Sequence, residues 1–297
     1  MTDSLITDEM AEHYWEHGYT IVRALYNTEL AEIYRDRFAA IVNGEVEACE
    51  GMLVMRDVMV AKGAIKPATR AEEVAKIQDF ENDEVLYSYV THAPMLDCVE
   101  RLVGRDVFTL HTMLINKPPN VDGRHPLHQD LLYFPFRPAD KIVAGWTALE
   151  RITKENGCLC VVPGSHKRGL LKHENPDWAH LNAGYFGAEG VGKNTDRVYV
   201  EMEPGDTVFF HPILLHGSGR NKTQGFRRAI SAHFASTECS WEWTIEGVDR
   251  NYKIVRGKNA GGWWKKPADS PGRKINPMDY LPFGPARPDK SETSENE

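Results

Sequence analysis

The sequence predicts a mainly β protein with flanking helices, and three observations support this prediction. First, helical spacing of apolar residues gives way near residue 107 to short runs rich in β-branched and aromatic residues. Second, turn pairs such as Asn156-Gly157 and Pro204-Gly205 separate these runs. Third, the 297 residues contain no internal repeat, which suits one large domain. Short strands that follow a helical N-terminal segment favour a double-stranded β-helix core, the jelly roll of the cupin type.

The segment before residue 107 is expected to form mostly helices. They are predicted at residues 8–17, from about residue 28 onward and at 83–102, with a break near Pro94 and one strand at 19–25. Asp8 is the expected N-cap of the first helix. In the second helix, the apolar residues recur at helical spacing and are predicted to face the core: Leu30, Ile33, Phe38 and Ile41.

The segment from residue 107 is expected to supply the strands. They are predicted at 107–115, 141–149, 158–162, 198–202, 206–211 and 228–235. Asn156-Gly157 is a strong signal for a hairpin turn. The expected organisation is one structural domain in three parts: an N-terminal helical or mixed region at 1–106, the β-helix core at 107–240, and a C-terminal extension at 241–297, whose last ten or so residues are expected to be disordered.

Charge and cysteine usage exclude several classes of protein. A net charge of −8, from 35 basic and 43 acidic residues, argues against nucleic-acid binding, which needs a basic face. Five scattered cysteines form no disulfide framework and indicate a reducing compartment. No apolar run approaches the ~18 residues of a membrane span, and no secretory signal is visible. A cytoplasmic location is therefore predicted. The expected lack of a C-terminal peroxisomal signal also favours the cytoplasm, and a peroxisomal location is the alternative if the protein is eukaryotic.

One short stretch carries a metal-binding pattern. His128 and Asp130 are separated by one residue, and in an extended segment such side chains point to the same side. His216 follows after several predicted strands, and a jelly roll would bring it to the same end of the barrel. Two histidines and one carboxylate hold non-haem Fe(II) and leave coordination positions open. A zinc or other metal cupin can use similar ligands and is the main competing interpretation.

Arg227 extends this pattern, because it follows His216 at the start of a predicted strand. An arginine binds a carboxylate with two parallel hydrogen bonds, so Arg227 suits the far carboxylate of 2-oxoglutarate. Ser218 could donate a further hydrogen bond. Other polar residues are better explained by structure. A solvated side chain is the first interpretation of Lys76, and hydrogen-bonded structural histidines are the first interpretation of His125, His166, His211 and His233.

Residues 51–236 closely resemble the phytanoyl-CoA dioxygenase family. The matching stretches are 54–58, 76–80, 111–119, 124–138, 156–159, 163–167 and 205–236, the last with Asn221-Lys222-Thr223-Gln224-Gly225-Phe226-Arg227. The resemblance implies that His128, Asp130 and His216 bind iron, and that Arg227 and Ser218 hold the distal carboxylate of 2-oxoglutarate. It also places Lys76, Met113 and Trp146 against this cosubstrate. For Lys76 it overrides the solvated interpretation.

The resemblance implies an Fe(II)- and 2-oxoglutarate-dependent dioxygenase that uses O2, with ascorbate as an optional reductant. Its reaction would hydroxylate the 2-position of a branched fatty acyl-CoA such as phytanoyl-CoA and release succinate and CO2. One alternative is a family member that acts on a free acid or a secondary metabolite. Another is a metal-binding cupin without oxygenase activity. The expected partner is the acyl-CoA substrate, with no nucleic acid and no membrane span, and the expected state is a monomer. The tail from about Cys239 does not match the family.

Overall fold

Two antiparallel sheets face each other in the computed structural model, which describes residues 5–119, 121–178, 182, 184–192, 195–245, 251–265 and 273–275. The main sheet runs β1 (Tyr19–Val22), β12 (Thr207–Phe210), β7 (Ile142–Ala148), β14 (Arg227–Ser236) and β4 (Val107–Lys117). The smaller sheet runs β11 (Val198–Val200), β8 (Leu159–Val161), β13 (His216–Ser218) and β5 (His125–His128). The predicted mainly β jelly roll with flanking helices is confirmed.

The far edge of β4 is shared by two strands. β3 (Val74–Gln78) pairs with its C-terminal half and carries β2 (Leu53–Arg56), while β17 (Tyr252–Arg256) pairs with its beginning and carries β18 (Trp263–Trp264). The remaining elements are short: α3 (Val58–Ala61), α4 (Arg70–Glu73), η1 (Asp130–Tyr133), η2 (Ala139–Lys141), η3 (Ser165–Arg168), β6 (Phe136–Arg137), β9 (His173–Glu174), β10 (Gly187–Ala188), β15 (Ser240–Trp241), β16 (Trp243–Ile245) and β19 (Arg273–Ile275).

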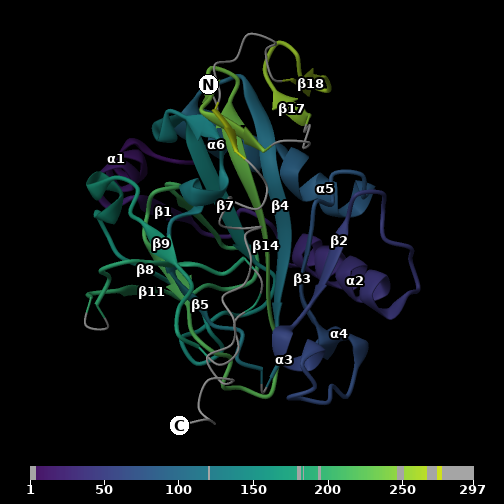
Figure 1. The fold of residues 1–297 in the computed structure, drawn as a ribbon. Helices are drawn as coiled ribbons and strands as arrows, with labels where there is room; N and C mark the ends of the chain where they lie inside the picture. The colour runs from purple at the N-terminus through teal and green to yellow at the C-terminus, as the bar shows by residue number, and fades with distance from the viewer. Residues whose placement is uncertain are drawn as a thin grey trace.

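The longer helices cover one face of the main sheet. They are α1 (Asp8–His17), α2 (Thr28–Asn43), α5 (Glu84–Thr91) and α6 (Ala93–Val103). In Figure 1, α2 and α5 lie on the opposite side of the long strands β4 and β14 from β5, β8 and β11. Successive strand residues point to opposite faces. In β14, Ile230, Ala232 and Phe234 therefore pack in the helix-covered core, while Arg227, Ser231 and His233 line a cavity on the other face.

Two local predictions in the N-terminal region are wrong. Thr7 caps α1 in place of Asp8, because its side-chain oxygen accepts a hydrogen bond from the Met10 N–H at 3.2 Å. Ile33 is 42% exposed, since the buried face of α2 is formed by Ala31, Tyr34 and Phe38. Helical spacing locates an apolar stripe, but its edge depends on which neighbouring elements cover the helix.

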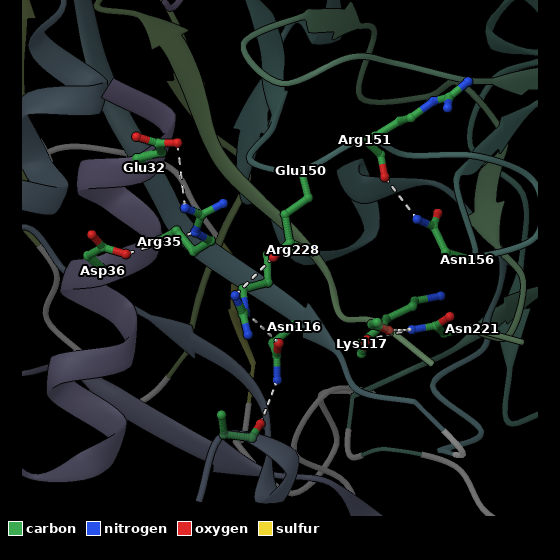
Figure 2. Close-up of polar contacts among 12 residues, drawn as sticks. Glu32, Arg35, Asp36, Asn116, Lys117, Glu150, Arg151, Asn156, Asn221 and Arg228 are labelled. Atoms are coloured by element: carbon green, nitrogen blue, oxygen red, sulfur yellow. Dashed lines mark hydrogen bonds and ion pairs between the residues drawn. The ribbon is translucent and has the colours of Figure 1, made fainter. Parts of the chain in front are cut away.

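Asn156-Gly157 does not close a hairpin. The strands on either side belong to different sheets, because β7 pairs with β12 and β14 while β8 pairs with β11 and β13. Asn156 accepts a hydrogen bond from the Thr153 N–H and donates one to the carbonyl oxygen of Arg151 at 2.9 Å (Figure 2). Gly157 has φ +89°, and a Cβ there would lie 2.7 Å from the Gly219 carbonyl oxygen. The turn therefore carries the chain from one sheet to the other.

The structure bears on two further expectations. All five cysteines are free thiols, as their scattered positions predicted. No described helix is long and apolar enough to cross a membrane. The division at residues 106 and 240 stays a prediction, and strands from both outer parts, β1 and β17 among them, join the main sheet. The last ten residues, for which disorder was expected, lie outside the described residues.

Candidate metal and cosubstrate site

A cavity of about 660 Å³ lies between the main sheet and the smaller sheet. Its lining includes all eight residues that were predicted to bind iron or cosubstrate: Lys76, Met113, His128, Asp130, Trp146, His216, Ser218 and Arg227. They come from β3, β4, β5, β7, β13 and β14 and from the start of η1. The fold thus brings together residues that are up to about 150 positions apart in the chain.

The two histidines and the aspartate form a compact, buried group. His128 and His216 are register partners in the β5–β13 pair, and Asp130 begins η1 directly after β5. Asp130 Oδ1 lies 3.2 Å from His128 Nε2 and 3.5 Å from His216 Nε2. Ligands about 2 Å from a shared ion at adjacent octahedral positions are about 3 Å apart. The spacing therefore fits three ligands on one face of a metal ion.

Local hydrogen bonds orient both imidazoles. Nδ1 of His128 donates to the carbonyl oxygen of Pro126 at 2.9 Å, and Nδ1 of His216 donates to that of Leu214 at 2.9 Å. A proton on Nδ1 leaves the lone pair on Nε2, the atom that faces Asp130. Burial lowers the pKa of His216 to about 4, so its ring is neutral at pH 7. Neutral imidazole is the form that binds a metal ion.

Asp130 has a separate partner for each carboxylate oxygen. Oδ1 faces the two histidines, while Oδ2 accepts a hydrogen bond from His233 Nε2 at 2.8 Å. Burial alone would raise the pKa of this carboxyl group, but His216 and His233 hold it well below its usual value. Asp130 is therefore a charged carboxylate, and its Oδ1 faces the two histidines. His233 was interpreted from sequence as a structural histidine, and its contact with Asp130 was missed.

Arg227 places a buried guanidinium group in the cavity wall. Its side chain is 1% exposed, and among the described residues its Nε and Nη1 atoms have no hydrogen-bond acceptor. The indole Nε1 of Trp146 is also buried without a described acceptor, and the Arg227 guanidinium lies 5.6 Å from the centre of the Trp146 ring. Ser218 lies two residues after His216 on β13 and lines the same cavity. These donors fit a carboxylate.

Lys76 and Met113 complete the predicted set from β3 and β4. Lys76 is half-buried, its Nζ lies 5.7 Å from the centre of the Tyr185 ring, and burial lowers its pKa to about 8. The solvated interpretation of this lysine is therefore wrong. Met113 is half-buried in the cavity wall, where it is a strand residue as well as a lining residue.

Several lining residues were not singled out from sequence. Tyr185 stacks on His125 at 3.8 Å, and His125 stacks on the metal-facing ring of His128 at 3.8 Å. Lys117, from the end of β4, lies next to Arg227. The C-terminal extension contributes Trp241, Trp243 and Tyr252. No spacing rule points to these residues, because each reaches the cavity through strand pairing or aromatic packing.

A jelly roll that gathers two histidines, a carboxylate and a buried arginine without a described carboxylate partner in one cavity defines a class: non-haem iron dioxygenases that use 2-oxoglutarate. Within this class, the chain belongs to the phytanoyl-CoA dioxygenase family (PhyH), whose model matches residues 14–229. The cofactors of this class are Fe(II), 2-oxoglutarate and O2, and the predicted residues fit iron and cosubstrate by the geometry described above.

Comparisons with individual proteins agree with this family assignment. The chain is 47% identical over 252 residues to a probable phytanoyl-CoA dioxygenase of Caenorhabditis elegans. The aligned region covers 82% of this chain and 80% of the relative. It is 45% identical over 245 residues to the peroxisomal phytanoyl-CoA dioxygenase of Homo sapiens. Here the aligned region covers 81% of this chain and 72% of the relative.

Solved structures share the fold at lower identity. The non-heme monooxygenase ThoJ superposes with a TM-score of 0.64 at 21% identity, over 88% of this chain and 89% of ThoJ. The epimerase SnoN, solved in complex with Fe3+, alpha ketoglutarate and nogalamycin RO, has a TM-score of 0.61 at 19% identity, over 84% of this chain and 98% of SnoN. These similarities establish the jelly-roll fold and nothing beyond it.

Proposed function

We propose that this protein hydroxylates the 2-position of a branched fatty acyl-CoA such as phytanoyl-CoA, with conversion of 2-oxoglutarate and O2 to succinate and CO2. The observation that carries the proposal is the shared cavity: a buried His128–Asp130–His216 group and an unpaired Arg227 open into one space. The substrate is supported by the relatives named phytanoyl-CoA dioxygenase, which are 45–47% identical over most of the chain.

His128, Asp130 and His216 would hold Fe(II) through Nε2, Oδ1 and Nε2. The bound iron and its cosubstrate would supply the oxidant that hydroxylates the C–H bond beside the thioester carbonyl. The protein's own contribution is placement. The carbonyl oxygens of Pro126 and Leu214 fix the two rings, and His233 fixes the carboxylate. No protein side chain has to act as a general base in this reaction.

Arg227 and Ser218 would anchor the distal carboxylate of 2-oxoglutarate, with Trp146, Lys76 and Met113 around the rest of the molecule. Both hydrogen-bond donors of Arg227 that lack a described acceptor are buried, and an unmet buried donor costs about 1–3 kcal/mol. A carboxylate at this place would remove that cost. Burial excludes water from the contact, which strengthens the attraction between guanidinium and carboxylate.

An apolar wall on the other side of the cavity suits a hydrocarbon chain. Trp241, Trp243 and Tyr252 line it, and all three follow the end of the family match at residue 229. At β2, Leu53 and Val54 also line the cavity while 49% and 43% exposed. Exposed apolar residues at a cavity mark a binding surface. A branched acyl chain would remove these side chains from water.

The test is succinate release by the anaerobically Fe(II)-loaded protein after addition of 2-oxoglutarate and O2, with phytanoyl-CoA compared with free phytanic acid. The expected result is turnover stimulated by the thioester and absent in His128→Ala. Stimulation by the free acid alone would assign a free-acid oxygenase. No succinate with any substrate, despite bound iron, would contradict the dioxygenase assignment and support a metal-binding cupin.

The relatives of human and mouse are named peroxisomal, which supports a peroxisomal location as the alternative to the cytoplasm. Fractionation of cells that contain the untagged protein distinguishes the two. The monomeric state stays a prediction, and light scattering after gel filtration tests it.

A further inference from the structure

Two neighbouring residue pairs on β4 and β14 differ in how their charges are matched. Asn116 pairs with Arg228 in the strand register, and Lys117 pairs with Arg227. On the helix-covered face, Arg228 donates to Glu150 Oε1 at 2.9 Å and to Asn116 Oδ1 at 3.2 Å (Figure 2). On the cavity face, two cations stand side by side. Within the described chain, neither Lys117 nor Arg227 forms an ion pair with a carboxylate.

This arrangement is costly without an anion. The side chains of Lys117 and Arg227 are 4% and 1% exposed. Burial lowers the pKa of Lys117 well below its usual value, and the neighbouring Arg227 lowers it further. A buried charge is tolerated in proteins when an opposite charge or hydrogen bonds compensate it. The cavity face of this strand pair is therefore built for a negatively charged ligand.

Lys117 contacts a second residue of the cavity wall, Ser218. Its Nζ donates to Ser218 Oγ at 2.7 Å and also to the carbonyl oxygen of Gly219. Because Nζ is the donor of this bond, Ser218 Oγ accepts it and its own O–H proton is available for another acceptor. The end of β4 is itself held, because Asn221 Nδ2 donates to the Lys117 carbonyl oxygen at 3.0 Å (Figure 2). The bond from Lys117 thus leaves the Ser218 O–H group to act as a hydrogen-bond donor.

We infer that Lys117 is a positioning residue for the distal carboxylate of 2-oxoglutarate, which it orients through the Ser218 hydroxyl and attracts as the second cation beside Arg227. The inference rests on the proposed function. Its consequence is selectivity: the site favours 2-oxo acids with a second carboxylate over 2-oxo acids that end in an alkyl group. Arg227 alone would bind the carboxylate, while Lys117 adds the oriented hydroxyl and the additional charge.

The experiment measures dissociation constants by calorimetry with the anaerobic Fe(II)-loaded protein. The probes are 2-oxoglutarate and 2-oxobutyrate, which share the metal-facing end and differ in the distal carboxylate. In Lys117→Met, 2-oxoglutarate is expected to bind about tenfold to a hundredfold more weakly, the range for a lost hydrogen bond within a charged site. Binding of 2-oxobutyrate should change less than about threefold. Lys222→Met, which removes an exposed lysine nearby, is the matched control.

The route through Ser218 is tested by Ser218→Ala and the double variant Lys117→Met/Ser218→Ala. If the lysine acts through the hydroxyl, the double variant should be no more than about threefold weaker than the weaker single variant. Fully additive losses would overturn this route. A Lys117→Met protein that keeps the wild-type preference for 2-oxoglutarate would overturn the inference as a whole.

Stability provides a second measurement. Removal of a buried cation without an anionic partner should leave the melting temperature of the ligand-free protein unchanged or higher. A Lys117→Met protein that fails to fold would also overturn the inference, because the lysine would then be a structural residue. Failure of the proposed function looks different: the wild-type protein itself would not bind 2-oxoglutarate.

Discussion

His233 Nε2 donates a hydrogen bond to Asp130 Oδ2 at 2.8 Å, and this contact leaves Oδ1 as the oxygen that faces His128 and His216. An ionised carboxylate can only accept, so Nε2 carries the proton. Both groups are buried, and they come from β14 and η1, which are far apart in the chain. The strand that carries Arg227 at its beginning therefore also orients the carboxylate ligand near its end.

His233→Ala is expected to weaken Fe(II) binding about tenfold to a hundredfold, the usual effect of removing a partner of a metal ligand. Without its donor, the carboxylate can rotate and either oxygen can face the metal. Competition with a chelator of known affinity measures the change. His13→Ala, which removes an exposed histidine of α1, serves as the control. Unchanged affinity in His233→Ala would mean that Asp130 is held by other contacts.

Substitution of the adjacent arginines should have opposite effects. Arg227→Leu removes a buried cation without a described partner, so the ligand-free protein should be as stable as the wild type or more stable, while the KM for 2-oxoglutarate rises at least tenfold. Arg228→Gln breaks a mostly buried ion pair with Glu150 and should cost about 1–3 kcal/mol of unfolding free energy. Denaturant unfolding and succinate assays separate the two effects. Similar changes of stability and of KM in Arg227→Leu and Arg228→Gln would contradict the conclusion that only Arg228 is paired with a carboxylate in the described chain.

Stability of the metal-free protein should fall as the pH decreases, in part because of His211. Burial lowers the pKa of His211 to about 4, although Asp140 opposes this with a hydrogen bond. Between pH 6.5 and about 4, the unfolded chain binds a proton that the folded one does not, so the folded state loses up to roughly 3 kcal/mol. Urea unfolding at pH 7.5 and pH 5 should show a smaller difference in His211→Gln than in wild type. Equal differences in both proteins would exclude His211 as a contributor.

Trp243→Ala is expected to raise the KM for phytanoyl-CoA more than the KM for 2-oxoglutarate. The indole is half-buried in the cavity wall, and loss of such apolar contact costs about 1–3 kcal/mol of binding. Steady-state assays with each substrate varied in turn measure the two constants. Trp15→Ala, at a 40% exposed position on α1, is the control. An equal rise in both constants would argue for a general disturbance of the fold.

The sequence alone located the parts of the site that depend on local spacing. His216 and Ser218 lie two residues apart on β13, so both reach the cavity by simple alternation. His128 ends β5, while Asp130 reaches the cavity from the first residue of η1, after the extended Gln129. The longer helices and the strands β1, β4, β7, β8, β11, β12 and β14 followed from sequence patterns as well, whereas β2, β3, β13 and β17 were not predicted. For Lys76, Met113 and Trp146, residue type and spacing gave no signal, and only the family resemblance singled them out.

What sequence reasoning missed depends on pairing between distant strands. Lys117 lies beside Arg227, and His233 reaches Asp130, only because of the register of β4, β14 and η1, which no local pattern encodes. The prediction of a hairpin at Asn156-Gly157 was wrong for a related reason. A turn is present there, but a turn does not determine whether the next strand joins the same sheet or the opposite one.

The backbone carbonyl oxygens that hold His128 and His216 have a consequence for metal supply. Because the carbonyl oxygens of Pro126 and Leu214 hold the two rings from within the chain, hydrogen bonds that need no ion orient both Nε2 atoms toward Asp130. A site whose ligands are already in place does not select one metal ion over another by folding around it. Two imidazoles with a carboxylate bind Zn²⁺, Ni²⁺ or Cu²⁺ more tightly than Fe²⁺. If these three residues bind the iron, we expect the fraction of active molecules to depend on which free metal is available when the chain matures. Metal analysis of the purified protein before and after reconstitution with iron tests this expectation.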